Sequence, residues 1–170
     1  MWALQFWKAV TKDRSDFLDR LLSVFERSAI RFCVIGGVAV NAYAEPLVTL
    51  DFELAIAPAN LERVEELMSR QFDVRRSASV LNMTAADSEL RVEIRADQRY
   101  APFVEGAQMA DVLGLGLPVA AVEDVLQEEI WAIDEGRRSR MGLLNIVRLI
   151  ETSPELAEHV PPHILARLIQ

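Results

Sequence analysis

A short apolar segment that stops at two consecutive glycines is the feature that most constrains the fold of this chain. Residues 31–35 (RFCVI) have the composition of a buried strand, and Gly36-Gly37 ends that strand. Residues 38–44 then fit a brief helix that ends before Pro46, because proline cannot continue a helix. The pattern therefore predicts a strand, a glycine pair and a helix in immediate succession.

An alternating strand follows and carries the first chemically informative side chains. In residues 48–57 (VTLDFELAIA), Thr49, Asp51 and Glu53 project from one face, and the apolar residues between them project from the other. Two carboxylates on one strand face can share a hard cation such as Mg²⁺, which is held by one or two carboxylates together with substrate phosphates. Backbone N–H groups at a glycine-initiated helix can approach the same phosphates. The alternative, a merely solvated strand face, is less favoured because the glycine pair precedes it, so the combination indicates phosphoryl transfer.

The rest of the pattern predicts a mixed α/β domain followed by helices. Apolar residues recur at helical spacing in 16–29, 58–70, 121–134, 143–152 and 162–169. Further strands are predicted at 72–76, 79–84 and 90–96. Residues 114–118 read as a loop or a short strand. We therefore predict one domain over residues 1–170, with an α/β core at 14–120 and a C-terminal helical subregion at 121–170.

Composition and charge exclude several classes of protein. The 170 residues are 51% hydrophobic and 26% charged, which is typical of a globular chain with a substantial core. The net charge of -8 opposes general attraction to nucleic-acid phosphates, because such binding comes mainly from Lys and Arg. No apolar run approaches the roughly 20 residues that cross a bilayer, so we predict a cytoplasmic protein with no membrane partner.

The segment CVIGGVAVNAYAEPLVTLDFELAIA resembles the signature of the DNA polymerase β-like nucleotidyltransferase superfamily. In that superfamily a GG or GS pair opens a helix, and a strand bearing Asp-x-Asp or Asp-x-Glu follows. The later stretches LRVEIRADQRYAPFVEGA, VLGLGLPVAAVEDVLQEEIWA and RRSRMGLLNIVRLIETSPEL resemble the AbiEii-type branch, minimal nucleotidyltransferases often found as toxins beside an antitoxin. The resemblance covers most of residues 29–161. It implies a nucleotidyltransferase fold, a small mixed sheet flanked by helices, with C-terminal helices closing over a nucleotide.

The same resemblance implies an activity and assigns residues to it. A nucleoside monophosphate would pass from a nucleoside triphosphate to a hydroxyl on an RNA or protein acceptor, with Mg²⁺ or Mn²⁺ bound by Asp51 and Glu53. Glu93 is the candidate third acid and general base, although it could instead pair with Arg91 or Arg95 on an exposed strand face. We expect both metal ligands and the glycine pair to meet in one cleft. The candidate nucleotide-binding residues are Gly36, Gly37, Thr49, Arg137 and Arg138.

Two departures from the AbiEii-type pattern bear on activity. Glu129 stands where that branch usually shows a lysine, and Met141-Gly142 stand where it shows Lys-Asp. If Glu129 faces the nucleotide as the resemblance implies, it repels the triphosphate unless an arginine of the 137–140 segment supplies the missing charge. The alternative function is therefore a catalytically degenerate module that binds a nucleotide or a partner. A toxin whose activity depends on a cognate antitoxin is a third possibility.

Overall fold

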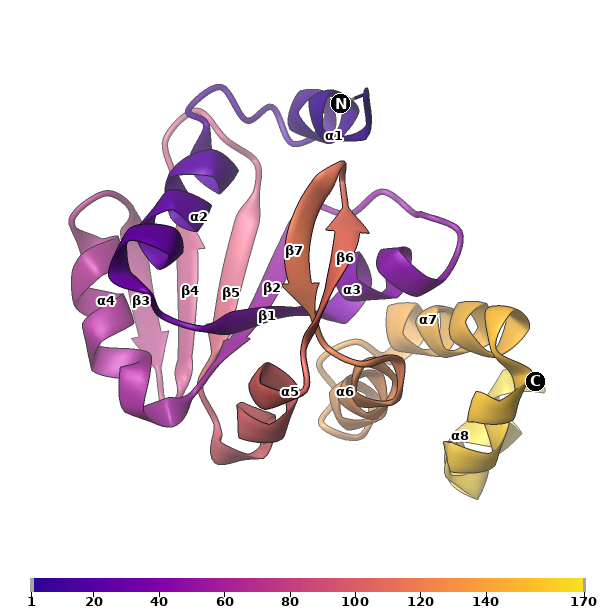
Figure 1. Cartoon of the computed structure of the whole chain (residues 1–170). Helices are drawn as coiled ribbons and strands as arrows, with labels where there is room; N and C mark the ends of the chain where they lie inside the picture. The colour runs from indigo at the N-terminus through magenta and orange to yellow at the C-terminus, as the bar shows by residue number, and fades with distance from the viewer. Residues whose placement is uncertain (1, 170) are drawn as a thin grey trace.

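The computed structural model describes residues 2–169, which fold around one mixed β-sheet (Figure 1). The strands are β1 (Phe32–Ile35), β2 (Asp51–Ile56), β3 (Asp73–Ser77), β4 (Val80–Thr84), β5 (Arg91–Arg95), β6 (Gln108–Val112) and β7 (Leu115–Val119). Their order across the sheet is β3-β4-β5-β2-β1-β7-β6. The predicted mixed α/β class is therefore confirmed.

Helices flank this sheet and also follow it in the chain. The α-helices are α1 (Trp2–Val10), α2 (Phe17–Ser28), α3 (Gly36–Tyr43), α4 (Leu61–Ser69), α5 (Ala101–Glu105), α6 (Val122–Asp134), α7 (Ser139–Thr152) and α8 (Pro162–Leu168). Three 3-10 helices are η1 (Pro58–Asn60), η2 (Gln98–Tyr100) and η3 (Pro154–His159). No helix of the described part of the chain is both long and apolar enough to cross a membrane.

The pairing of the central strands brings the sequence motifs together. β1 and β2 are antiparallel, and Ile35, the residue before the glycine pair, lies opposite Glu53. β2 and β5 are parallel, and Glu53 lies beside Glu93 in their register. The short α3–β2 connection thus returns the acid-bearing strand to the point where the glycine pair begins its helix.

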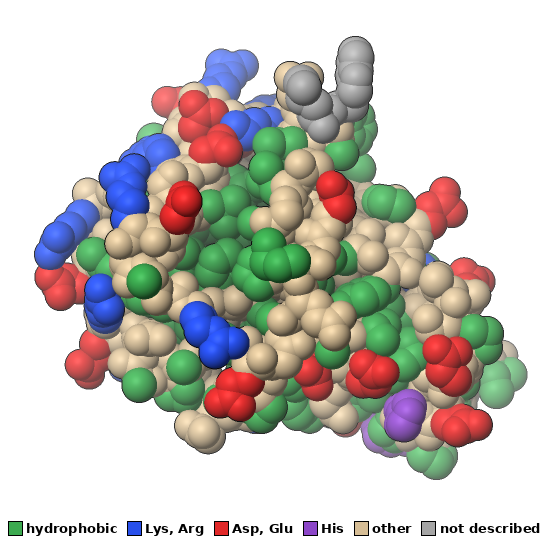
Figure 2. All heavy atoms as spheres, in the orientation of Figure 1, with side chains coloured by type: hydrophobic (Ala, Val, Ile, Leu, Met, Phe, Trp, Pro, Cys, Tyr) green, Lys and Arg blue, Asp and Glu red, His purple; other side chains and the backbone are tan. Residues whose placement is uncertain are grey.

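The two faces of the sheet differ in polarity. Phe32 packs against Phe25 of α2 with ring centroids 4.6 Å apart, and the register of β1 with β2 places Leu54 on that same face. α2 and α4 lie over the β3–β5 half of this face (Figure 1). Hydrophobic side chains also gather in the hollow beside α2 in Figure 2, where Leu22 and Leu117 help to line an apolar groove of about 500 Å³. The alternate residues of β2, with Asp51 and Glu53 among them, point to the opposite face.

Several elements differ from the sequence prediction, among them α5, where no helix was predicted. β6 was not predicted, because Gln108–Val112 lies at the sheet edge and has no regular alternation of apolar and polar residues. α1 was also not predicted, and its Trp7 packs on Phe52 and donates its indole N–H to the carbonyl of Thr49 at 2.8 Å. α7 begins at Ser139, one turn earlier than expected.

Candidate functional site

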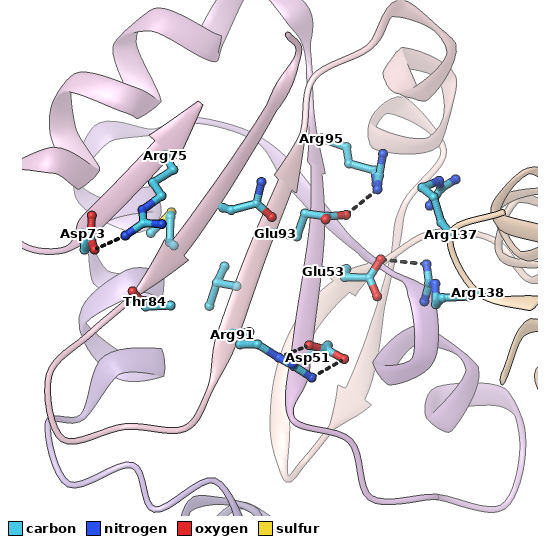
Figure 3. Close-up of a pocket in the computed structure, with 13 residues that line it drawn as sticks. Asp51, Glu53, Asp73, Arg75, Thr84, Arg91, Glu93, Arg95, Arg137 and Arg138 are labelled. Atoms are coloured by element: carbon cyan, nitrogen blue, oxygen red, sulfur yellow. Dashed lines mark hydrogen bonds and ion pairs between the residues drawn. The ribbon is translucent and has the colours of Figure 1, made fainter. Parts of the chain in front are cut away.

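A pocket of about 660 Å³ opens on the sheet face that carries Asp51 and Glu53 (Figure 3). Its walls come from β2, β3, β4 and β5 and from the turn between α6 and α7. The charged residues of the lining are Asp51, Glu53, Asp73, Arg75, Arg91, Glu93, Arg95, Arg137 and Arg138. Five arginines against four carboxylates give this pocket a formal charge of +1 in a chain whose net charge is -8. Because the buried Glu128 pairs with both Arg137 and Arg138, the charges around this pocket nearly balance, and the pocket is less negative than the chain as a whole.

Asp51 lies at the open side of the pocket and is paired with an arginine from the neighbouring strand. The β2–β5 register puts Arg91 beside Asp51, and the guanidinium donates to both carboxylate oxygens at 2.7 and 3.2 Å. The side chains are 47% exposed for Asp51 and 62% for Arg91. An exposed pair of this kind contributes about 0–1 kcal/mol, so Asp51 can exchange this partner readily.

Glu53 is deeper, and its surroundings are different. Its carboxylate is buried and accepts a hydrogen bond from Arg138 Nη2 at 2.7 Å. Burial raises the pKa of Glu53 to about 8, against the lowering effect of Arg138, and the nearby carboxylates of Glu128, Glu93 and Glu129 raise it further. Burial and the neighbouring carboxylates thus outweigh the direct contact with Arg138 in setting the pKa of Glu53.

Gly36 is needed because Glu53 lies against it. The residue has φ of +67°, and a Cβ there would come within 2.7 Å of Glu53 Oε1 and 3.0 Å of Arg138 Nη1. Gly37 is far less restricted, since the nearest atom to a Cβ would be Asn145 Nδ2 at 4.0 Å. Gly36 thus meets Glu53 as predicted, but neither glycine lines the pocket, because the Arg138 guanidinium lies next to Gly36.

Two further predicted residues have clear positions. Glu93 lines the pocket and pairs with Arg95 at 2.6 Å, so the ion pair that was considered as an alternative role is present. Thr49 lies outside the pocket lining, and its hydroxyl accepts the backbone N–H of Asp51 at 3.1 Å. Thr49 therefore orients the start of β2.

Arg137 and Arg138 share a buried carboxylate that the sequence prediction missed. Glu128 of α6 is fully buried and accepts from Arg137 Nη1 at 3.0 Å and from Arg138 Nη2 at 3.0 Å. Burial lowers the pKa of Arg138, but the carboxylates of Glu53, Glu128 and Glu129 more than offset this and leave that pKa raised. Glu128 therefore holds both arginines, as cations, at the pocket edge.

The expectation that Glu129 faces the nucleotide is corrected. Glu129 is fully buried, lies outside the pocket lining and has Oε1 3.7 Å from Arg138 Nη1. Burial raises its pKa to about 7, with Arg138 opposing the shift. A signal was present in the sequence, because Glu129 falls between Leu126 and Ile133 on the apolar stripe of α6. It is a buried counter-charge behind Arg138.

Met141 and Gly142 also lie away from the pocket lining. Met141 is 51% exposed. A Cβ on Gly142 would come within 2.7 Å of Ile133 Cγ1, so this glycine permits the close packing of α7 on α6. In the described structure Met141 therefore lies at the surface and Gly142 serves packing between α6 and α7.

The pocket offers some of the oxygen ligands that a hard divalent cation needs, but not a complete set. Asp51 and Glu53 offer carboxylate oxygens from one strand face, which is the ligand type and number that Mg²⁺ takes when substrate phosphates supply further oxygens. Among residues 2–169, no group of three or more His, Cys, Asp or Glu is placed to hold a metal ion by itself. The two acids therefore fit a metal ion that arrives with phosphates better than a preformed metal site.

Comparison with known proteins finds similar structures but no similar sequence. No family model matches the chain, and no curated protein matches it. The solution structure of the antibiotic-resistance factor ANT(2'')-Ia superposes with a TM-score of 0.69 over 92% of this chain and 94% of that one, at 12% identity. The crystal structure of ANT(2'')-Ia in complex with adenylyl-2''-tobramycin gives 0.67, covering 89% and 97%, at 12% identity. The chain has a nucleotidyltransferase fold.

A third solved structure supports the same nucleotidyltransferase fold. The lincosamide antibiotic adenylyltransferase LnuA, in its lincomycin-bound form, has a TM-score of 0.57 over 82% of this chain and 98% of its own, at 12% identity. The fold predicted from the glycine pair and the Asp-x-Glu strand is thus confirmed. The AbiEii-type branch stays a prediction.

Proposed function

We propose that this chain transfers a nucleoside monophosphate from a nucleoside triphosphate to a hydroxyl acceptor, with Mg²⁺ or Mn²⁺. The observation that carries the proposal is the placement of Asp51 and Glu53 on the pocket face of β2 beside a cluster of arginines. The fold shared with antibiotic adenylyltransferases supports the same class of reaction.

The charged residues divide between the metal ion and the phosphates. Asp51 and Glu53 would hold the divalent ion, which when bound stabilises negative charge on the attacking and leaving oxygens. Arg137 and Arg138 would bind the triphosphate, because a guanidinium matches phosphate oxygens with two parallel hydrogen bonds.

The reaction forms one bond and breaks one. The acceptor oxygen forms a bond to the α-phosphorus, the bond from that phosphorus to the β-phosphate bridging oxygen breaks, and pyrophosphate leaves. Glu93 is the candidate base that takes the hydroxyl proton, because it lines the pocket on the strand beside Glu53.

The charge of the pocket disfavours one class of acceptor. Each carboxylate of the lining has an arginine partner: Arg91 for Asp51, Arg138 for Glu53, Arg95 for Glu93, and Arg75 for Asp73 at 3.8 Å. Polycationic acceptors, which need unpaired carboxylates, fit this pocket poorly. The acceptors in this proposal are a hydroxyl on RNA or protein, as the AbiEii resemblance suggests, or a small molecule comparable to the lincomycin bound by LnuA. The same resemblance suggests an antitoxin as a partner protein.

One observation favours a second candidate function. Because arginines already neutralise the lining carboxylates, the pocket could bind a nucleotide or a partner without turnover. In such a degenerate module, nucleotide binding would depend on the arginines and not on a divalent ion.

The test is an assay of nucleotide transfer with all acceptor classes present. The protein is incubated with each α-labelled nucleoside triphosphate, Mg²⁺ or Mn²⁺, and total RNA, proteins or small-molecule fractions, and both label transfer and pyrophosphate are measured. Label transfer that Asp51→Asn abolishes supports the enzyme. Calorimetric nucleotide binding with no transfer, equal in wild type and Asp51→Asn, supports the degenerate module.

A further inference from the structure

Arg138 lies where the metal ligand Glu53 and the glycine pair meet. It precedes α7 in the turn after α6, donates to Glu53 at 2.7 Å and lies next to Gly36. The side chain of Arg138 is 19% exposed and that of Glu53 9%. A cation is therefore already in contact with Glu53 in the free protein.

The partners of Arg138 on the helix side allow it to leave Glu53 without losing all of its counter-charges. Its Nη2 also donates to Glu128 at 3.0 Å, and its Nη1 lies 3.7 Å from Glu129. A buried charge that loses its only partner is strongly destabilised, but Arg138 keeps two carboxylates when the contact with Glu53 breaks.

We propose that Arg138 blocks Glu53 in the free protein, and that a bound triphosphate draws Arg138 away and makes Glu53 available to the divalent ion. The proposal rests on the proposed function, because it concerns the same metal ligands. It sets an order in which the nucleotide binds before the metal ion.

Electrostatics explains the order. A divalent ion that arrives alone meets a guanidinium in hydrogen-bonding contact with the oxygen it needs, and like charges repel at that distance. A triphosphate brings several negative charges and binds the guanidinium directly. The other ligand, Asp51, is not decisive, because its pair with Arg91 is exposed and contributes little.

The test measures binding of Mn²⁺ to the wild-type protein with and without a non-hydrolysable nucleoside triphosphate. Electron paramagnetic resonance counts free Mn²⁺, and water-proton relaxation detects Mn²⁺ held by the protein and nucleotide together. We expect Mn²⁺ alone to bind at least about tenfold more weakly than in the ternary complex, equivalent to about 1.4 kcal/mol or more. Equal Mn²⁺ affinity in the two conditions overturns the proposal. So does a failure of the nucleotide to bind when no metal is present.

A charge-balanced variant sharpens the test. Arg138→Met combined with Glu128→Gln removes one cation and one anion, so Mn²⁺ alone should bind about tenfold more tightly than it binds wild type. Arg91→Met is the matched control, and its Mn²⁺ affinity should stay within about threefold of wild type. An unchanged affinity in the folded double variant overturns the proposal. If thermal melting shows that the double variant does not fold, Arg138→Met alone is measured in its place: tighter binding of Mn²⁺ alone supports the block, and an unchanged affinity overturns it.

The two proposals fail in different ways. A protein that transfers nucleotides but binds Mn²⁺ equally well with and without the nucleotide keeps the proposed function and loses the binding order. A protein that shows the binding order but no transfer with any acceptor keeps the block by Arg138 and loses the proposed function.

Discussion

The sheet side and the helix side of the pocket carry the same kinds of charge but bury them to different extents. On the sheet side, the pairs of Asp51 with Arg91 and of Asp73 with Arg75 are exposed and separate from each other. On the helix side, ion pairs link Glu53, Arg138, Glu128, Arg137, Glu135 and Arg99 into one chain that begins in the protein interior. The charged side chains of the sheet side can therefore exchange their ion-pair partners for a substrate at little cost in stability. The buried ion pairs of the helix side, in contrast, help to hold the folded structure together.

The largest expected effect is a loss of activity without a loss of stability, from a substitution on the sheet side. Asp51→Asn should lower nucleotide transfer by about 10³-fold or more, a loss of about 4 kcal/mol of transition-state stabilisation, because it removes a ligand of the divalent ion. The melting temperature should stay nearly unchanged, since the exposed pair with Arg91 contributes little. Pyrophosphate release and a thermal melt measure the two effects. A variant that unfolds would show Asp51 to be structural.

Reversal of a buried charge should cost a large part of the stability of a domain of this size. Glu129→Lys places an ammonium next to Arg138 with no water to screen it, so we expect a loss of about 3–5 kcal/mol in the free energy of unfolding. Asp73→Lys makes the same change on the sheet side, where exposure should limit the effect to about 0.5 kcal/mol. Urea unfolding of both variants measures the difference. Similar losses in the free energy of unfolding of the two variants would mean that the charges of the two sides are equally exposed to solvent.

The raised pKa values on the helix side predict how stability depends on pH. Glu53 and Glu129 have pKa values of about 8 and about 7, raised mainly by burial, so each keeps a proton in the folded state that the unfolded chain releases above its usual pKa. Their stabilising effect is complete below about pH 4.5 and is lost as the pH rises to about 8, so the metal-free protein should become less stable across this range. Metal-free unfolding across this range measures it. Glu53→Gln should flatten the profile, and an equally steep profile in that variant contradicts the assignment.

The smallest expected effect concerns the glycine beside Glu53. Gly36→Ala should lower the free energy of unfolding by about 2 kcal/mol, from backbone strain at positive φ and from contact with Glu53. Gly136→Ala is a close control, because its φ is +69° but nothing lies within 4 Å of a Cβ there. It should therefore lose only about 1 kcal/mol. Equal losses in the two variants would mean that Glu53 moves aside freely.

The sequence predicted the parts of the site that depend on local pattern. The glycine pair can be read directly from the sequence, and the alternation that puts Asp51 and Glu53 on one face needs only strand periodicity, whereas the place of Glu93 on a neighbouring strand was implied by the superfamily resemblance. These features lie within about sixty residues of one another in the chain and are fixed by backbone hydrogen bonds.

The helix side could not be predicted in the same way. Acids on an amphipathic helix usually face water, so the place of Glu129 on the apolar stripe of α6 was not enough to predict a buried ion cluster with Glu128. Their burial depends on Arg138, which approaches only because α7 packs closely against α6. The AbiEii-type branch usually has a lysine at the position of Glu129, but that correspondence could not reveal the burial of Glu129. Burial is set by packing between helices and not by alignment.

The contact between Gly142 and Ile133 limits which substitutions this protein can accept in evolution. Any side chain at Gly142, including the aspartate of the AbiEii-type pattern, would meet Ile133 at 2.7 Å and push α7 away from α6. Because Arg138 immediately precedes α7, the same displacement would move the guanidinium away from Glu53. An aspartate at position 142 is therefore expected to require a smaller residue at position 133 first. The two positions are epistatic, and the order in which they change determines whether the intermediate protein keeps its site.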